Sequence, residues 1–304
     1  MTRVFRPIFL GALLLFGSLH IRAQSYVDLI TASYNYSPPS NYEISDATTA
    51  IQHADVSVSL PFPIEEGPIL LPGFNMSVNR LILDPASPEP TTLYSAALHI
   101  GLRLDFGNNW SGTHYLFPRL STAFEESRAG LQIATLQLFE KQKSPQSSYG
   151  FGLYASKESF GWMLVPLLSF YYQSPDNQYE LRLFLPSRGD VNYRLTDHLR
   201  AGLYFDGLGS SHDLQSPQFG RSYVQRISND LQAYLRFDLS PSLLLAVRAG
   251  YSFFRTYRVY DADDTAGVSI ANIFFNDQRT PLNQTVEDGF IFGVRIIYRY
   301  HFER

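Results

Sequence analysis

Long segments of this chain alternate, one residue at a time, between apolar and polar side chains. The clearest example is 288–302, where alternate positions hold Phe290, Phe292, Val294, Ile296, Tyr298, Tyr300 and Phe302. Charged residues such as Arg295 and Arg299 lie between them. Successive side chains of a β-strand point to opposite faces of its sheet. The pattern therefore predicts strands with one apolar and one charged face, and it recurs at 94–106, 226–238 and 243–253.

The alternating segments are long and end in aromatic residues. Several run for about 10–15 residues, whereas strands that span a bilayer need about 9–11 and soluble strands average about 5–6. Tyr94 and Phe106 bracket one segment as an aromatic girdle would. Only helices and closed barrels satisfy backbone hydrogen bonding in lipid, and no apolar run of 18 residues follows the N-terminal segment. We therefore predict an all-β, transmembrane antiparallel up-and-down β-barrel; a soluble sheet protein with its charged face outside remains the alternative.

The N-terminal segment has the order of a secretory signal. Arg3 and Arg6 precede an apolar run at 8–19, and Ala23 offers a small residue for cleavage. We predict a cleaved signal peptide at 1–23 and an outer-membrane β-barrel at 24–304, in a Gram-negative bacterium. A buried N-terminal helix is the alternative interpretation of the same residues.

Composition excludes several classes of function. Loss of the three arginines in 1–23 changes the formal net charge from −4 to −7, which disfavours nucleic-acid binding. The chain has no cysteine, so it has no disulfide, thiolate metal ligand or lipid-modified cysteine. Charged residues make up 17% of the chain, below the roughly 25% of soluble domains, and aromatic residues make up 15%.

The pattern predicts about fourteen strands, near 26–36, 48–62, 72–83, 92–106, 111–122, 130–140, 148–157, 162–173, 178–185, 190–195, 199–207, 223–238, 243–259 and 288–302. If the short segments 178–185 and 190–195 form one loop, the count falls to twelve. Segments 113–122, 131–139 and 163–172 alternate poorly. Short turns are predicted at sites such as 107–109 and 240–242, and longer polar connections near 37–47, 84–91, 208–222 and 260–287.

Two stretches resemble known outer-membrane proteins. The last strand, with Gly293, Ile296, Tyr298, Tyr300 and Phe302, resembles the assembly signal of outer-membrane barrels, although two residues follow Phe302. Residues 179–208 resemble a family of uncharacterised bacterial outer-membrane β-barrel proteins, a domain of unknown function. The resemblance implies a barrel fold and an outer-membrane location, and no activity. We expect outer-membrane lipids and the assembly machinery as partners.

The polar face of the predicted strands would line the lumen and is rich in arginine. The predicted lumen residues are Arg103, Arg182, Arg194, Arg200, Arg226, Arg236, Arg248, Arg295, Arg299, Asp105, Glu180, Asp206, Asp230 and Asp238. Rings of arginine select anions, so one interpretation is an anion-favouring pore for small solutes. The other is a structural or envelope-assembly barrel whose lumen is filled by arginine–carboxylate pairs.

Enzyme and metal chemistry find weaker support. A barrel enzyme acting on lipids would need a Ser or Asp beside a His. The candidate groups are His99 with Asp105, His212 with Ser211 and Asp213, and His53 with Asp55. None matches a motif that we can name, and 261–264 resembles only half of a calcium loop. We therefore predict no enzymatic activity, no metal and no cofactor.

Overall fold

The computed structural model describes residues 26–65, 67–123 and 130–301. The predicted signal peptide, 1–23, lies outside these ranges. Within them, no helix is long and apolar enough to cross a membrane.

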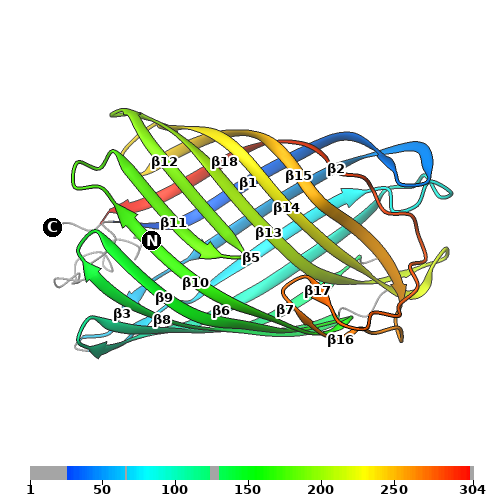
Figure 1. The fold of residues 1–304 in the computed structure, drawn as a ribbon, viewed down its shortest axis with the longest axis horizontal. Helices are drawn as coiled ribbons and strands as arrows, with labels where there is room; N and C mark the ends of the chain where they lie inside the picture. Colours follow the sequence, from blue (N-terminus) through cyan, green and yellow to red (C-terminus); the bar gives the residue numbers. More distant parts are fainter. Residues whose placement is uncertain (1–25, 66, 124–129, 302–304) are drawn as a thin grey trace, which may run out of the picture.

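Fourteen long strands form one closed antiparallel barrel (Figure 1). The first seven are β1 (Tyr26–Tyr42), β2 (Ser45–Ser59), β5 (Gly73–Leu81), β6 (Thr91–Gly107), β7 (Trp110–Thr122), β8 (Gly130–Ser144) and β9 (Ser147–Glu158). The others are β10 (Gly161–Gln173), β11 (Tyr179–Leu185), β12 (Arg188–Thr196), β13 (Leu199–Ser216), β14 (Gly220–Asp238), β15 (Leu243–Asp261) and β18 (Gly289–His301). Each pairs with the next, and β18 pairs with β1 to close the ring. The predicted fold and the count of fourteen are confirmed.

The strands β11 and β12 are the short pair that the sequence left in doubt. They pair with each other and with β10 and β13, so both belong to the wall. Four short strands complete the sheet: β3 (Phe62–Pro63), β4 (Ile69–Leu70), β16 (Gly267–Ile270) and β17 (Ile273–Phe274). The predicted turn at 107–109 is confirmed, and Gly107, Asn108 and Asn109 all have positive φ (78°, 52° and 64°), a conformation that glycine and asparagine tolerate best.

The apolar face of each strand lies on the outside of the barrel. On β18, Phe290, Phe292 and Ile296 are between 47% and 64% exposed, whereas Arg299 between the exposed positions is buried. The same division holds on β14, where Leu231 is exposed and Arg236 is buried. This arrangement matches a barrel whose exterior contacts hydrocarbon and contradicts the alternative of a soluble protein with its charged face outside.

The two ends of the barrel differ. We call the end where Tyr26 pairs with His301 the terminal end, and the opposite end the distal end. At the distal end the predicted connections 37–47 and 208–222 are wrong, because β1 runs to Tyr42 and the β13–β14 hairpin extends to a turn at 217–219. Their polar residues belong to long strands, which the loop-like composition concealed.

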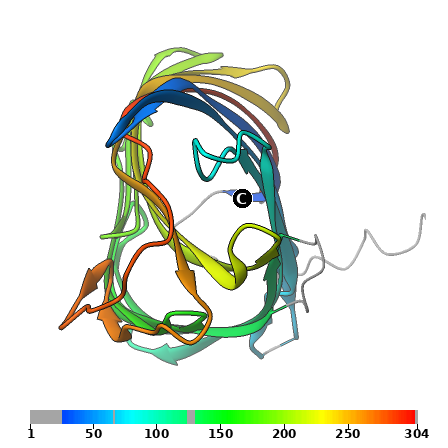
Figure 2. The same cartoon turned by 90° about the vertical axis from the view of Figure 1, so that its right-hand side faces the viewer.

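The distal parts of β13, β14 and β15 leave the wall and enter the barrel. We call residues 207–229 and 253–261 the inner flap. Asp213 pairs in parallel with Thr122 of β7, and the backbone N–H of Ala123 donates to the carbonyl of Asp213 at 3.0 Å. In the ring β7 and β13 are separated by five other strands. The flap therefore crosses the distal mouth, as the yellow-green hairpin does in Figure 2.

Apolar side chains on one face of the flap close the distal mouth. We call this cluster the distal seal; it comprises Tyr42, Ile51, Leu81, Leu83, Leu93, Ala123, Leu214, Val224, Tyr257, Val259 and Val286, each no more than 5% exposed. Side chains of this size contribute about 1.5–3 kcal/mol each when fully buried. The seal is therefore a packed core rather than a loose lid.

The other face of the flap packs against the inner wall. Tyr223 and Tyr260 of the flap are buried against Phe160 and Met163, and Val165 and Leu167 of β10 belong to the same cluster. The lumen side of β10 is thus apolar here, as is its lipid side. This explains why segment 163–172 alternates poorly in the sequence.

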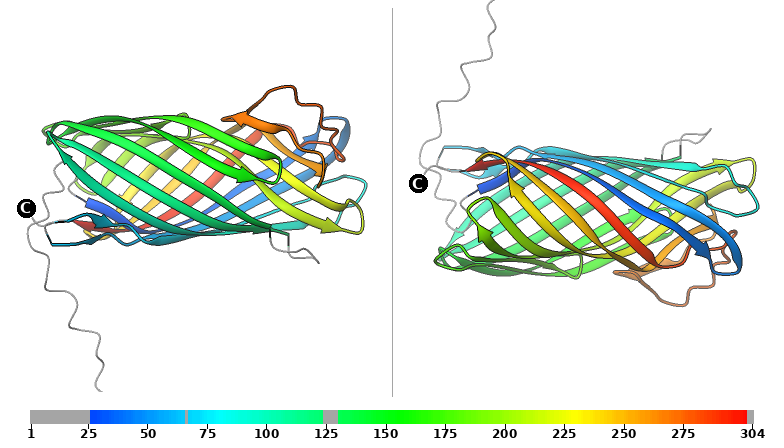
Figure 3. Two further views of the ribbon diagram at one scale, coloured as in Figure 1. Left: turned by 90° about the horizontal axis from the view of Figure 1, so that it is seen from below. Right: turned by 90° about the horizontal axis from the view of Figure 1, so that it is seen from above.

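The connection 262–288 covers the flap from outside (Figure 3). Its strand β16 pairs in parallel with residues 161–164 of β10. Its Arg279 stacks on Tyr260 at 4.2 Å from the ring centroid and donates to the hydroxyl of Tyr223 at 3.0 Å. Hydrogen bonds from Arg279 also hold the pKa of Asp277 below its usual range. The connection therefore fastens the flap to the wall.

An ion pair joins the first and last strands at the terminal end. Arg299 donates to both carboxylate oxygens of Asp28, at 2.6 and 3.1 Å, and its guanidinium lies 3.4 Å from the centroid of Tyr26. The side chain of Arg299 is 6% exposed and that of Asp28 is 26% exposed. The pair bridges the seam that closes the barrel.

We predict that Arg299→Ala lowers the free energy of unfolding by about 3 kcal/mol, because loss of one partner leaves a partly buried charge unpaired. Urea unfolding of the protein in liposomes measures the change. The matched control is Arg221→Ala, which breaks the exposed Arg221–Asp263 pair (76% and 84% exposed) and should cost less than about 1 kcal/mol. Equal effects of the two variants would contradict a stabilising role for the seam.

Candidate functional site

The barrel encloses one large cavity of about 1100 Å³. Its lining comes from most strands of the wall, from the inner flap and from residues 271–273 of the long connection. Cavities that hold small molecules usually measure about 300–1000 Å³. The lumen is therefore large enough for a solute of that kind.

Three arginines on neighbouring strands face this cavity. Arg226 lies on β14, Arg248 on β15 and Arg295 on β18, and all three line the cavity. The guanidinium groups of Arg248 and Arg295 lie 5.4 and 5.6 Å from the ring centroid of Tyr204. We call Arg226, Arg248, Arg295 and Tyr204 the arginine site. Arg248 and Arg295 flank Tyr204, whereas Arg226 lies farther along the cavity, where its guanidinium is 5.8 Å from the ring centroid of Tyr257.

The guanidinium groups of the site lack carboxylate partners. Within the described part of the chain, no Asp or Glu oxygen lies within 4.0 Å of Arg226, Arg248 or Arg295. The Nε atom of each is buried and has no hydrogen-bond acceptor. A buried donor without an acceptor costs about 1–3 kcal/mol, more when it is charged. An anionic ligand would supply the missing acceptors.

Carboxylates near the site are few and partly engaged. Asp206 pairs with Arg188 at 3.5 Å, and Asp55 lies 3.6 Å from His53. Asp230 lines the same cavity. Arg119 and Arg188 face the cavity as well, so five arginines and three aspartates line it.

The terminal end of the lumen has the opposite character. Glu180 accepts from the Tyr26 hydroxyl at 2.7 Å and from Arg182 at 2.9 Å. Asn192 and Arg299 adjoin the same group, which leaves a space of only about 50 Å³. Here arginines and carboxylates pair and fill the barrel.

The fourteen predicted lumen residues thus divide into three groups. Lining the large cavity are Arg226, Arg248, Arg295, Asp206 and Asp230. Around the small space at the terminal end are Glu180, Arg182, Arg236 and Arg299, together with Arg248 and Arg295. Engaged in local contacts are Arg103 with Glu140, Arg194 with Asp197, Arg200 with Asn192, Asp238 with Arg236, and Asp105 with the N–H of Gly107.

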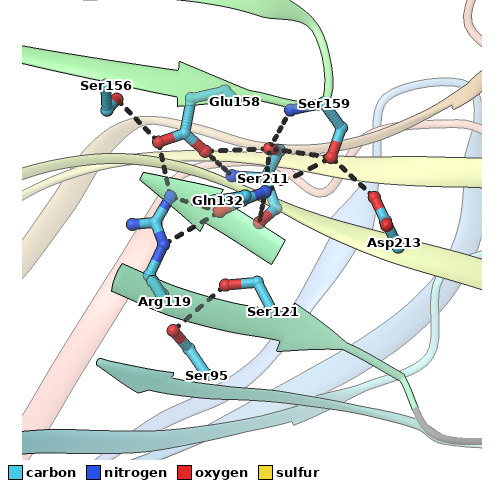
Figure 4. Close-up of polar contacts among 9 residues, drawn as sticks. All are labelled: Ser95, Arg119, Ser121, Gln132, Ser156, Glu158, Ser159, Ser211 and Asp213. Carbon is cyan, nitrogen blue, oxygen red and sulfur yellow. Dashed lines mark hydrogen bonds and ion pairs between the residues drawn. The ribbon is translucent and has the colours of Figure 1, made fainter. Parts of the chain in front are cut away.

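A second polar cluster holds the flap to the wall (Figure 4). The buried carboxylate of Glu158 accepts from the backbone N–H and the hydroxyl of Ser211 at 2.9 and 2.8 Å. Arg119 donates to the same carboxylate, and Gln132 donates to the Ser211 hydroxyl at 3.0 Å. Ser159 donates to Asp213 at 2.7 Å. These side-chain hydrogen bonds replace the backbone hydrogen bonds that the flap loses when it leaves the wall.

Sequence reasoning missed Arg119 and Glu158, and it named Ser211 only as a possible partner of His212. Arg119 lies on a segment that alternates poorly, Glu158 directly follows a predicted strand, and Ser211 lies in a predicted loop. The sequence shows that these residues are polar or charged. It does not show that they contact one another, because that contact depends on the flap crossing the barrel. Tyr204 and Arg188 lie on the polar face of strands that alternate well, so the alternation could have found them.

Of the three predicted histidine groups, the structure brings His53 and Asp55 together, at 3.6 Å. His99 lies against the rings of Tyr115 and Phe117, with centroids 6.4 and 5.1 Å away. Consecutive strand residues point to opposite faces, so His212 faces away from Ser211 and Asp213. Among the residues that the structure describes, no group of three or more His, Asp or Glu side chains could hold a metal ion.

The fold and the site define an outer-membrane type of β-barrel with a charged lumen. The family model described as Domain of unknown function (DUF6268) matches residues 84–299, more than half of the chain. The chain belongs to this family, which confirms the resemblance predicted from 179–208. Comparison with curated proteins gave no match.

Several solved structures are similar in fold. The COG4313 outer membrane channel from Pseudomonas putida F1 has 10% identity and a TM-score of 0.41, with 93% of this chain and 99% of that chain covered. OprB of Pseudomonas putida has 9% identity and a TM-score of 0.36, covering 91% and 94%. A FadL homologue of Pseudomonas aeruginosa has 12% identity and a TM-score of 0.34, covering 89% and 90%.

We predict that Glu158→Ala releases the inner flap and raises single-channel conductance in planar bilayers several-fold. The substitution removes the acceptor of Ser211 and leaves Arg119 without its carboxylate. Wild-type protein should conduct weakly, because the distal seal closes the mouth. Retention of the folded, heat-modifiable band in gels shows that the variant is a barrel.

A disulfide provides the control for this experiment. Strand neighbours lie about 4.8 Å apart, within the roughly 4.4–6.8 Å that a disulfide spans, so Thr122→Cys with Asp213→Cys should lock the flap. The chain has no other cysteine. In a Glu158→Ala variant that also carries these two cysteines, oxidation should restore the low conductance. A folded Glu158→Ala variant with wild-type conductance would show that Glu158 does not hold the flap.

Proposed function

We propose that this protein is an outer-membrane transport barrel that carries small anionic solutes. The observation that carries the proposal is the arginine site, where the Nε atoms of three cavity-facing arginines are buried and have no acceptor among the described residues. Arginine-lined passages favour anions, and a charge surrounded by low-dielectric walls acts over a longer range than in water. An anion entering the lumen would find fixed donors already in place.

The outer-membrane location is part of this proposal. Its support is the exposed apolar exterior of the closed barrel, together with the predicted signal peptide at 1–23. Outer-membrane lipids would contact the exterior, and the outer-membrane assembly machinery would insert the chain. Cleavage of the precursor after Ala23 is the expected maturation step.

A structural barrel with an occluded lumen is the second candidate. One observation favours it: the distal seal closes the mouth with side chains that are almost fully buried. A purely structural barrel, however, would gain nothing from unpaired arginines around a large cavity. Carboxylates placed beside them, as at the terminal end, would fill the lumen at lower free energy.

We predict that the protein carries succinate into liposomes faster than glycerol or choline, at a rate limited by opening of the inner flap, because the distal seal otherwise closes the mouth. Arg248→Gln with Arg295→Gln should lower succinate influx at least tenfold, because both guanidinium groups that flank Tyr204 are lost. Influx of labelled solute into proteoliposomes measures the effect.

The matched control is Arg103→Gln, which removes an arginine that does not line the cavity. Succinate influx should stay within twofold of the wild-type rate in this variant. If the double variant and the wild-type protein carry succinate equally fast, or if neither prefers it to glycerol, the transport proposal fails. The result would then favour a structural barrel with an occluded lumen.

A further inference from the structure

The barrel wall contains a gap in its hydrogen-bond ladder. β10 pairs with β11 only from Leu168 onward and with β16 only up to Leu164. β12 ends its pairing with β13 at Asp206. In the described chain, residues 165–167 of β10 and 208–212 of β13 therefore have no ladder partner on the edges that face one another.

Two turns bound this gap. On the terminal side, the N–H of Gly207 donates to the carbonyl of Ser187 at 2.7 Å. On the distal side, the N–H of Ala271 donates to the carbonyl of Leu164 at 2.7 Å. We call the space between 165–167, 186–187, 207–209 and 271–272 the side opening.

The cavity reaches the exterior through the side opening. Ile273 and Phe254 line the cavity, yet they are 64% and 75% exposed. Ile273 directly follows 271–272, which bound the side opening. Residues that line a cavity and are also largely exposed mark the place where the cavity meets the exterior.

Glycines let the two turns pack closely against this edge. A Cβ atom at Gly209 would lie 2.3 Å from Oδ1 of Asn272, and one at Gly207 would lie 3.2 Å from the carbonyl oxygen of Pro186. Side chains at these two positions would therefore project into the space between the edges and the turns.

The part of the cavity next to the side opening is apolar. We call Leu136, Tyr154, Met163, Val165, Leu167 and Phe184 the apolar wall, and all of them line the cavity. They come from β8–β11, whereas the arginine site is on β13–β15 and β18. Outside, Leu168, Phe254 and Ile273 are 52%, 75% and 64% exposed around the opening. Apolar surface thus continues from the exterior into the lumen.

We propose that the cavity receives an amphipathic organic anion through the side opening, with its acidic head at the arginine site and its hydrocarbon part on the apolar wall. The proposal rests on the anion-binding role of the arginine site in the proposed function. The distal seal blocks the direct route through the mouth. A solute with a hydrocarbon part concentrates at the membrane, where the apolar rim of the opening faces it.

Binding of three probes to the protein in nanodiscs tests the two-part site. The probes are octane-1-sulfonate, methanesulfonate as the head alone and 1-octanol as the tail alone, and the sulfonates stay charged at all working pH values. Octanesulfonate should bind at least tenfold more tightly than either of the others. Val165→Thr, of nearly the same shape, and Leu167→Asn should weaken octanesulfonate and leave methanesulfonate unchanged.

The outcomes separate this inference from the function on which it rests. If both sulfonates bind equally and Arg248→Gln with Arg295→Gln weakens both, the apolar part of the proposal is wrong and the anion site stands. If octanol binds as tightly as octanesulfonate, the two-part site is wrong. If the binding of neither sulfonate depends on Arg248 and Arg295, the proposed function fails as well.

A bulky residue in the opening tests the route. Ser187→Trp should slow octanesulfonate influx into proteoliposomes at least fivefold and leave the barrel folded, because the bond from Gly207 uses only the Ser187 backbone. Ser87→Trp, in the distal connection between β5 and β6, is the matched control and should leave influx unchanged. Unchanged influx in folded Ser187→Trp would overturn entry through the side opening.

Discussion

Closure of the backbone hydrogen-bond ladder is the constraint on which this structure depends. In hydrocarbon each unpaired N–H or C=O costs several kcal/mol, so the fourteen strands must form a ring, which the pairing of β18 with β1 completes. Alternation then directs every second side chain into the lumen. In the inner flap the chain leaves the ladder, and there Glu158, Gln132 and Ser159 supply hydrogen bonds that neighbouring strands would otherwise make.

The distribution of carboxylates decides which part of the lumen is filled. At the terminal end Glu180 and Asp28 neutralise Arg182 and Arg299, and the side chains close around one another. Farther into the barrel Arg248 and Arg295 have only Tyr204 between them. The same residue type therefore serves as internal support in one half and leaves an electropositive cavity in the other. Of the two interpretations of the arginine-rich face, internal pairing holds at the terminal end, and the pore proposal rests on the arginines farther into the barrel.

Most of the wall could be predicted from the sequence, because alternation is a local signal that each strand carries by itself. The flap could not. Residues 208–222 have the polar composition of a loop, but Ser211 and Asp213 are polar because they bond to the opposite inner wall. The apolar lumen face of 163–172 likewise reflects packing against the flap. Individual site arginines could be predicted, whereas their partners depend on which distant strands the ring brings together.

The central claim is that the lumen contains guanidinium groups that no carboxylate of the described residues approaches within 4.0 Å. Anomalous diffraction from crystals soaked in bromide tests it directly, because bromide reports where an anion finds uncompensated positive charge. The account predicts a strong anomalous peak inside the barrel, at Arg248 and Arg295 beside Tyr204. Peaks confined to the exterior and the turns, with none in the lumen, would contradict it.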